Sequence, residues 1–278
     1  MLSLTKIALL TGGAIGAALA GINIAISLKC PQLKHINVPI SKLPKHLRGL
    51  RILHISDIHN VSTKHINVNI WDMAFEQRFD IAVITGDMTK AYFDQILPLK
   101  GVLTRLSERA PTFFVDGNHE QAHFVQMKAF MESCGIQVLD NKKVSVDING
   151  ESLEILGIRD FYFQKRHGFE PLSELMEDEP KQGFRLFLSH QPQVIDRLAV
   201  DFEDIFVISG HTHGGQIRLP FVKTIVAPGQ GFFPKYGDGL YKVKRCYLYI
   251  SRGIGASRIS VRFFNRPEVG VIRLVRGR

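Results

Sequence analysis

Cysteine is scarce in this chain of 278 residues. Its three cysteines, Cys30, Cys134 and Cys246, lie far apart and never form a Cys-x-x-Cys pair. This number and spacing argue against a disulfide framework and against a zinc site built from thiolates. Internal repeats and low-complexity tracts are also missing, and hydrophobic residues make up 45% of the chain. We therefore expect a folded globular domain with a sizeable core over most of the length.

Acidic residues are too few to balance the basic ones. The 26 Asp and Glu residues are outnumbered by 35 Lys and Arg residues, which leaves a formal charge of +9. Such a balance favours anionic partners, including phosphates, acidic lipid head groups and nucleic acid. The sequence has no RNA-recognition, zinc-finger or helix-turn-helix pattern beside the charge, so no nucleic-acid partner is expected. No obligate protein partner is indicated either.

The N-terminal segment lacks charged residues from Ile7 to Leu28. As a helix this run measures roughly 33 Å, enough to cross the hydrocarbon core of a bilayer. A cleaved signal peptide is one interpretation, with Ala18-Leu19-Ala20 as the candidate cleavage site. The apolar run continues beyond that tripeptide, which favours an uncleaved transmembrane anchor over residues 1–28. Asn23 and Ser27 are two of the few polar interruptions.

The side of the membrane on which the remaining chain lies is left open by the flanking charges. Only one basic residue, Lys6, precedes the apolar run. Several follow it: Lys29, Lys34, Lys42, Lys45, Arg48 and Arg51. The positive-inside rule taken alone would keep the following domain cytoplasmic. The signal-like beginning argues for export instead.

Residues 29–48 are polar and proline-bearing, and we expect a linker there with one edge strand. Residues 49–278 are expected to form a single α/β domain, because short apolar runs alternate with helical patterns. The expected buried strands are Arg51–Ser56, Ile81–Thr85, Thr112–Val115, Phe184–Leu188 and Ile205–Ser209. The expected helices are Val68–Arg78, Tyr92–Arg109, Gln121–Cys134 and Gln193–Leu198. A hairpin is expected around Asn149-Gly150, and further strands at Leu240–Lys244, Arg245–Ser251 and Val269–Val275.

Each of the five buried strands is followed by side chains that can bind a metal ion. They are Asp57 and His59, then Asp87, then Asn118 and His119, then His190, and finally His211 and His213. The carboxyl ends of strands in open α/β sheets meet in one crevice, so these residues can share a site. A single Asp or His after a strand is usually a cap or a surface residue. Five successive strand ends with such residues favour a functional site.

The types and spacing of these residues indicate the chemistry. Carboxylate, amide and imidazole ligands suit manganese, iron or zinc, and their number suits two divalent ions rather than one. In extended chain, residues two apart point the same way, so Asp57 and His59 can reach one cluster. Gly86, Gly117 and Gly210 precede ligands and are expected to permit the sharp turns that aim them.

The order of these motifs resembles the calcineurin-like metallophosphoesterases. The motifs are Asp-x-His, Gly-Asp, Gly-Asn-His-Glu, Ser-His and Gly-His-Thr-His. Gly-His-Thr-His-Gly-Gly-Gln, Ser-Arg-Gly-Ile-Gly (251–255) and Asn-Arg-Pro-Glu (265–268) are similar to the membrane-associated bacterial branch that contains the YkuE and YaeI phosphoesterases. The resemblance extends from about Arg51 to the C-terminus. It implies a four-layer α-β-β-α sandwich, in which two mixed sheets are flanked by helices.

The resemblance also implies roles for individual residues. One ion is expected to bind Asp57, His59, Asp87 and His213. The second is expected to bind Asp87, Asn118, His190 and His211, so that Asp87 bridges both ions. His119 is implied to lie beside the substrate, where we expect it to be catalytic; the alternative is a residue that only orients the ligands. Asp116 departs from the family pattern, which has an apolar residue or proline there, but no ligand is lost.

The expected activity is therefore metal-dependent hydrolysis of a phosphoester. Two divalent ions about 3.5–4 Å apart can activate a shared water, and His119 can protonate the leaving alkoxide. We expect a phosphodiesterase that acts on a membrane- or envelope-associated substrate, such as a lipid resembling UDP-diacylglucosamine, at a bacterial inner membrane. Arg252 and Asn60 are candidate substrate contacts, and a structural ion pair is the alternative for Arg252. A non-catalytic, membrane-anchored metal-binding scaffold is the alternative function.

Overall fold

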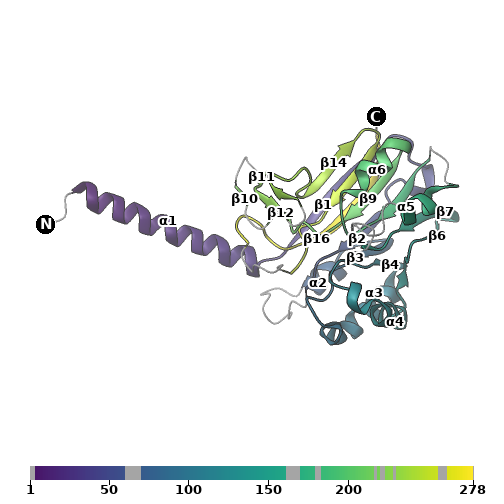
Figure 1. Ribbon diagram of the computed structural model, residues 1–278, viewed down its shortest axis with the longest axis horizontal. Coiled ribbons are helices and arrows are strands. Elements are labelled where there is room, and N and C mark those ends of the chain that lie inside the picture. Colours follow the sequence, from purple (N-terminus) through teal and green to yellow (C-terminus); the bar gives the residue numbers. More distant parts are fainter. Residues whose placement is uncertain are drawn as a thin grey trace.

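The computed structural model describes residues 4–59, 70–160, 170–178, 183–215, 218–219, 223–227, 230–255 and 262–277. It consists of a long N-terminal helix followed by a domain of two sheets and flanking helices (Figure 1). Helix α1 extends over Leu4–Lys29 and projects away from the domain. Among the described residues, no helix combines the length and the apolar character needed to span a membrane. The transmembrane anchor therefore stays a prediction.

The first sheet has six strands in the order β1-β16-β2-β3-β4-β5. Their bounds are β1 Gln32–Ile40, β16 Glu268–Arg276, β2 Arg51–Ile55, β3 Ile81–Thr85, β4 Thr112–Val115 and β5 Gln137–Val138. Strands β2 to β5 are parallel, whereas β16 runs antiparallel to β2. β2, β3 and β4 are nearly continuous buried apolar runs, as strands covered on both faces require.

The second sheet also has six strands, in the order β14-β15-β9-β8-β7-β6. Their bounds are β14 Gly239–Val243, β15 Cys246–Ile250, β9 Ile205–Ser209, β8 Arg185–Leu188, β7 Glu151–Gly157 and β6 Lys142–Ile148. Asn149 and Gly150 join β6 to β7 with φ of 55° and 83°, as a two-residue hairpin turn requires. Four two-residue strands form two small two-stranded ribbons between β9 and β14 in the sequence: β10 Arg218–Leu219 with β11 Lys223–Thr224, and β12 Val226–Ala227 with β13 Gly231–Phe232.

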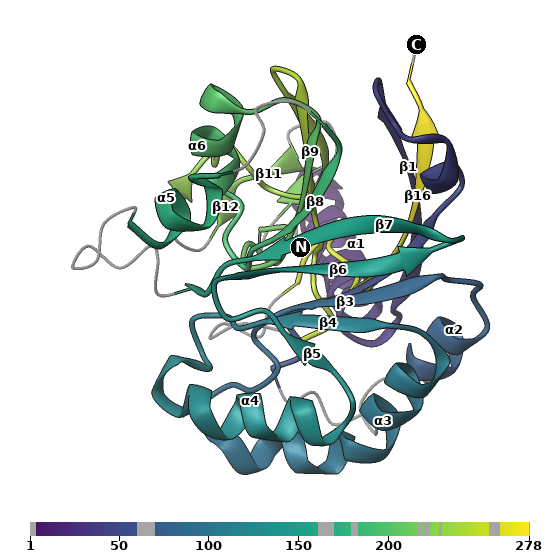
Figure 2. The same cartoon turned by 90° about the vertical axis from the view of Figure 1, so that its right-hand side faces the viewer.

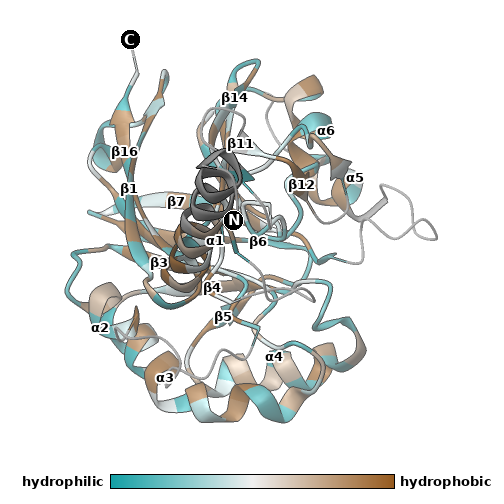
Figure 3. Cartoon of the chain, turned by 90° about the vertical axis from the view of Figure 1, so that its left-hand side faces the viewer, coloured by the Kyte–Doolittle hydropathy of each residue, from teal (hydrophilic) through white to brown (hydrophobic). Residues whose placement is uncertain are grey.

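Helices cover the outer faces of the two sheets, and the sheets pack on each other (Figure 2). The first sheet is covered by α2 Ile70–Phe75, α3 Lys100–Arg109 and α4 Phe124–Ser133. The second is covered by α5 Glu170–Met176 and α6 Val194–Asp201. Figure 3 shows hydrophobic segments along the strands and alternating character on α3 and α4. The expected four-layer mixed α/β arrangement is confirmed.

Several boundaries differ from the sequence prediction. The helix expected over Tyr92–Arg109 is divided into the 3-10 helix η3 (Phe93–Leu99) and α3, because Pro98 cannot donate a backbone hydrogen bond. Likewise, η4 (Gln121–His123) precedes α4. The stretch 29–48 contains β1 and the 3-10 helix η1 (Lys45–Leu47). Since β1 pairs with β16 over nine residues at the edge of the first sheet, the expected edge strand is confirmed, whereas the expected linker is wrong for Gln32–Ile40, which belong to the sheet.

Candidate metal centre

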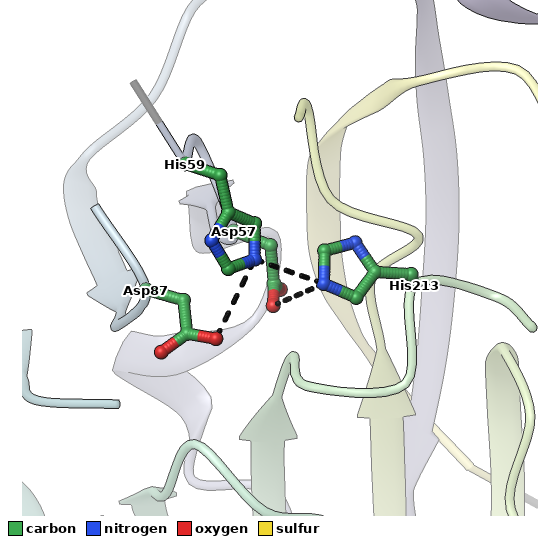
Figure 4. Close-up of side chains that lie close together, drawn as sticks. All are labelled: Asp57, His59, Asp87 and His213. Atoms are coloured by element: carbon green, nitrogen blue, oxygen red, sulfur yellow. Dashed lines mark hydrogen bonds and ion pairs between the residues drawn. The ribbon is translucent and has the colours of Figure 1, made fainter. Parts of the chain in front are cut away.

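Four side chains from three strand ends form the first cluster of donor atoms. Asp57 and His59 follow β2, Asp87 follows β3, and His213 follows β9 of the other sheet. His59 Nε2 lies 3.0 Å from His213 Nε2 and 3.5 Å from Asp87 Oδ2. His213 Nε2 lies 3.5 Å from Asp57 Oδ1. Figure 4 shows all four side chains converging on one point, and each is buried.

A second cluster lies on the other side of Asp87. The Oδ2 atom of Asp87 is 3.3 Å from Nε2 of His190, a residue that follows β8. Asn118 follows β4, and its Oδ1 atom lies 3.2 Å from His190 Nε2 and 2.9 Å from His211 Nδ1. His190 Nε2 and His211 Nδ1 are 3.1 Å apart. The structure thus brings together all seven predicted ligands in the two expected groups, with Asp87 in both.

The separations between these donor atoms fit the edges of a metal coordination shell. Bonds of about 2.1 Å place neighbouring ligands about 3.0 Å apart in an octahedron and about 3.4 Å apart in a tetrahedron. The pairs described above are separated by 2.9 Å, between Asn118 and His211, to 3.5 Å, between His59 and Asp87, and all donor atoms of one cluster lie within 4.8 Å of one another. Imidazole nitrogens and carboxylate oxygens at these separations could hold divalent ions.

The backbone at the ligands is strained. Asp57, His59, Asp87, His211 and His213 have φ of 52°, 48°, 53°, 70° and 52°. Residues other than glycine seldom adopt such angles, and conformations of this kind cluster at functional sites. The hydrogen bonds from the amides of Asp57 and His59 to the carbonyls of Gly86 and Asp87 hold the first two ligands in place.

Two of the three glycines are needed for space rather than for a turn. Only Gly86 has a positive φ, of 78°. A Cβ atom on Gly210 would overlap Ser56 Oγ and the carboxylate of Asp57, and one on Gly117 would overlap the carboxylate of Asp87. The expectation that all three glycines permit sharp turns is therefore wrong for Gly117 and Gly210. Their role is to let loops from different strands approach the ligands closely.

Burial sets the charge of the imidazoles. It lowers the pKa of His59 to about 4 and that of His211 to about 3, and it holds the pKa of His213 well below its usual range. These three rings are neutral at pH 7, the form that binds metal ions. His190 differs: burial lowers its pKa, but the carboxylate of Asp87 raises it well above the usual value.

The tautomer of His190 follows from its surroundings. Its Nδ1 atom lies 2.7 Å from the carbonyl oxygen of Thr85, which can only accept, so Nδ1 carries a proton and donates. Nε2 is then the nitrogen that faces Asp87 and Asn118. A backbone acceptor of this kind orients a metal-binding imidazole.

His119 lies at the rim of the clusters. Its side chain is 21% exposed, and its Nε2 atom is 3.9 Å from Asp87 Oδ2. Its ring meets that of His59 edge to face, with centroids 4.8 Å apart. Nδ1 donates to the carbonyl of Lys90, which leaves Nε2 directed to the clusters. This is a position from which a side chain can reach both the ligands and a bound molecule.

Glu120 is a functional residue that the sequence reasoning missed. It is fully buried, and its carboxylate accepts hydrogen bonds from the amides of Asp87 (2.7 Å), Gly117 (2.8 Å) and Thr89 (3.1 Å). It therefore connects the loop after β4 with the loop after β3. Burial, reinforced by the charge of Asp87, raises the pKa of Glu120 to about 8. Its place in the Gly-Asn-His-Glu motif was the available signal.

A buried hydrogen-bond chain leads to Asp57 and was also missed. His54 Nε2 lies 2.8 Å from Thr85 Oγ1, Thr85 donates to Ser56 Oγ at 2.8 Å, and Ser56 donates to Asp57 Oδ2 at 2.6 Å. Because the hydroxyl proton of Thr85 is directed to Ser56, His54 Nε2 must donate to Thr85. The chain orients the first ligand from inside the sheet.

Arg252 lies near the clusters but is held by carboxylates. Its Nε atom is 2.8 Å from Asp238 Oδ2 and 3.5 Å from Glu268 Oε2. This is the structural ion pair given above as the alternative, and the phosphate contact stays a prediction. Asn60 lies outside the described residues. Asp116 accepts the backbone amide of Asp160 and pairs with Arg159, which explains a carboxylate at this position.

The Asn-Arg-Pro-Glu block supports the loop that carries His213. Asn265 is buried, and its amide nitrogen donates to the carbonyls of His213 and Gly215, each at 2.7 Å. Glu268 accepts hydrogen bonds from Tyr249 and from the amide of Arg252. These contacts explain why a motif far from the ligands in sequence belongs to the site.

Comparison with known proteins decides the family. Residues 50–215 match the family model described as calcineurin-like phosphoesterase, which is more than half of the chain and includes all the predicted ligands. This chain belongs to the calcineurin-like phosphoesterase family. The family and the names of its relatives identify it as a hydrolase of phosphoric esters.

The relatives of this calcineurin-like phosphoesterase include two proteins of Bacillus subtilis. It is 28% identical to the uncharacterized metallophosphoesterase YkuE over 84% of this chain and 82% of that protein. It is 30% identical to the uncharacterized metallophosphoesterase YkoQ over 80% of this chain and 82% of that protein. A Danio rerio protein named transmembrane protein with metallophosphoesterase domain is 28% identical over 92% of this chain, which covers 60% of that protein.

Proposed function

We propose that this chain is a two-metal phosphodiesterase that acts on a phosphate ester presented at a membrane. The observation that carries the two-metal part is the position of Asp87, whose Oδ2 atom lies 3.5 Å from His59 Nε2 and 3.3 Å from His190 Nε2. One carboxylate between two groups of donors is suited to bridge a pair of ions. Manganese, zinc and iron all suit these oxygen and nitrogen ligands.

The side chains divide the work. When bound, two divalent ions supply Lewis-acid activation of water and neutralise charge on the phosphoryl group. His119 faces the same space with Nε2, and in its protonated form it can donate a proton to the leaving alkoxide. Glu120 and the hydrogen-bond chain from His54 to Ser56 keep the ligands Asp87 and Asp57 oriented.

Three features support a substrate at a membrane. The chain carries a net charge of +9, which favours a polyanionic head group. Its first helix contains a long uncharged run, and one relative is named a transmembrane protein. We therefore propose attachment to a bacterial inner membrane by α1 and a lipid-linked phosphodiester resembling UDP-diacylglucosamine as substrate, with either side of the membrane open for the domain.

The test is hydrolysis by the purified full chain with Mn²⁺. Bis-p-nitrophenyl phosphate and p-nitrophenyl phosphate are compared at equal concentration, with Asp87→Asn as the matched variant. Faster hydrolysis of the diester, lost in Asp87→Asn, is expected. Faster hydrolysis of the monoester would reverse the assigned preference. No hydrolysis of either ester by protein with metal demonstrably bound would favour the non-catalytic scaffold.

A further inference from the structure

The last turns of α1 expose three large apolar side chains and direct two polar side chains to the domain, in contrast to a helix in water. Leu19, Ile22 and Ile26 are exposed by 62%, 57% and 43%, whereas Ser27 is buried and Asn23 is half-buried against the domain. A water-facing helix directs its apolar residues to the protein and its polar residues outward. The reversed arrangement is stable where the surroundings of the helix are apolar.

The two inward polar side chains bind the domain. Asn23 Oδ1 accepts the backbone amide of Phe264 at 2.8 Å, and Ser27 Oγ accepts that of Asn265 at 3.3 Å. Ser27 also donates to Asn23 at 3.4 Å. Backbone amides without water must find a partner in the protein. These contacts therefore suit a loop that lies at the depth of lipid rather than in bulk solvent.

Three exposed phenylalanines lie in the loop beside α1 and in the ribbon of β12 and β13. Phe264, beside Asn23, is 45% exposed, and Phe232 and Phe233 are 75% and 71% exposed. β10, β11 and β12 lie at the end of the domain from which α1 emerges (Figure 1), and β13 pairs with β12. The amide of Arg218 in β10 bonds to the carbonyl of Phe263, which joins the β10–β11 ribbon to the same loop. Exposed aromatic rings are enriched where proteins meet the membrane interface.

The connection between α1 and the domain is short and is held by hydrogen bonds. Only Cys30 and Pro31 separate α1 from β1, and the guanidinium of Arg266 bonds to both of their carbonyls, at 2.8 Å and 3.0 Å. Lys29 and Lys34 directly after the apolar run are exposed. Lysines at this level complement anionic lipid head groups. These contacts restrain the orientation of the domain relative to the helix.

We propose that the end of the domain formed by the last turns of α1, the Phe264 loop and the Phe232–Phe233 ribbon docks directly on a lipid bilayer. This proposal rests on the membrane attachment proposed above and extends it from the helix to the domain. It also bears on the metal centre, because Asn265, next to Phe264, holds the carbonyl of His213. The loop that contacts lipid is thus the loop that supports a metal ligand, which sets the site at a constant height above the membrane.

The experiment measures how near the domain lies to lipid. In a Cys30→Ser background, where the remaining Cys134 and Cys246 are buried, single cysteines replace Phe264, Leu19 or Val125. Val125 is 80% exposed on α4, remote from α1, and serves as the matched control. The full chain is labelled with an environment-sensitive fluorophore and reconstituted in vesicles of phosphatidylcholine and phosphatidylglycerol that contain a nitroxide lipid.

We expect the nitroxide to quench roughly half of the fluorescence at positions 264 and 19, because apolar groups at such a surface lie about 5–10 Å into the head-group boundary. The label at position 125 should keep its fluorescence. Quenching at 19 without quenching at 264 would place the domain away from the membrane and overturn the proposal. So would equal quenching at 264 and 125, or none at 19. Hydrolysis is not part of this readout, so a failed phosphoester assay leaves it unaffected.

Discussion

At the scale of single residues, the ligands combine unfavourable backbone angles with buried charge. Asp57, for example, has φ of 52° and is completely buried, and burial raises its pKa to about 6. Hydrogen bonds from Ser56 and from the amide of His211 offset part of this cost. Two aspartates and four histidines are gathered in this largely buried site. Bound cations would stabilise it further, because they offset the cost of the buried charge.

His119 is expected to matter for turnover more than for metal binding. Replacement by alanine removes the proton donor at the rim but none of the seven predicted ligands, so the metal content should stay unchanged. We expect hydrolysis of bis-p-nitrophenyl phosphate to fall by about 10²–10⁴-fold. Metal analysis and steady-state kinetics on the same preparation check both parts. Normal turnover in His119→Ala would remove this residue from the mechanism.

His54 predicts a pH dependence of stability. Burial lowers its pKa to about 3 from the usual 6.5, so the folded protein favours the neutral ring. The contribution of the neutral ring to the free energy of unfolding is complete above pH 6.5. It is lost as the pH falls from 6.5 toward 3, by at most about 1.4 kcal/mol per pH unit. Urea unfolding of the full chain in detergent should show a shallower acid slope for His54→Gln than for the wild type.

The exposed His35 on β1 provides the control, because His35→Gln should keep the wild-type slope. Parallel curves for His54→Gln and the wild type would show that this ring has no such role.

The ligands could be predicted from the sequence, whereas the residues that orient them could not. Asp57, Asp87 and the histidines stand in short motifs directly after apolar runs, so their chemistry is visible locally. His54 lies within a strand and looks like any core residue. Its role in orienting Asp57 depends on a hydrogen bond to Thr85, 31 positions away, and such tertiary contacts leave no local pattern in the sequence.

At the scale of elements, the loops after the strands approach one another so closely that side chains are excluded. Gly210 follows β9 of the second sheet, yet its Cα faces Ser56 and Asp57, which follow β2 of the first. Gly210→Ala should therefore displace Asp57 and lower the affinity for metal by at least about tenfold, as the loss of a contact that supports a metal ligand does. Metal titration by calorimetry measures this.

Gly101 in α3 has open space at its Cβ position and is the matched control. Gly101→Ala should bind metal normally and gain up to about 1 kcal/mol of stability from better helix propensity. Full metal binding by Gly210→Ala would show that the loop can move aside without disturbing Asp57.

Buried strands were predicted more accurately than the edges of the domain. The apolar runs that became β2, β3, β4, β8 and β9 are recognisable because both faces of each strand are covered. β1 exposes the polar residues Lys34 and His35, which are consecutive and so lie on opposite faces of the strand; the stretch therefore resembles a linker until its pairing with β16 is known. The ribbons β10 to β13 are two residues per strand, too short for any periodicity.

At the scale of the whole molecule, the metal centre joins two halves that otherwise meet through apolar packing. Asp57, Asp87 and Asn118 come from the first sheet, and the histidines 190, 211 and 213 come from the second. Residues such as Ile52 and Phe206 fill the layer between the sheets. The residues alone indicated an α/β domain, and only the family resemblance predicted two sheets that face each other. Pairing between strands as distant as β1 and β16 has no local signal.

Because its ligands come from both sheets, a bound metal ion should stabilise the sandwich as a unit. Ions present at about 100 times their dissociation constant contribute about 2.7 kcal/mol, which corresponds to a rise of roughly 5–10 °C in Tm for a domain of this size. Differential scanning calorimetry of the chelated full chain with and without added Mn²⁺ should show this shift. Asp87→Asn, which weakens the link between the clusters, should lose most of it, whereas Asp94→Asn on the exposed side of η3 should retain it. An equal shift in Asp87→Asn would mean that Asp87 does not bridge the two donor groups and that the sheets are joined by each cluster separately.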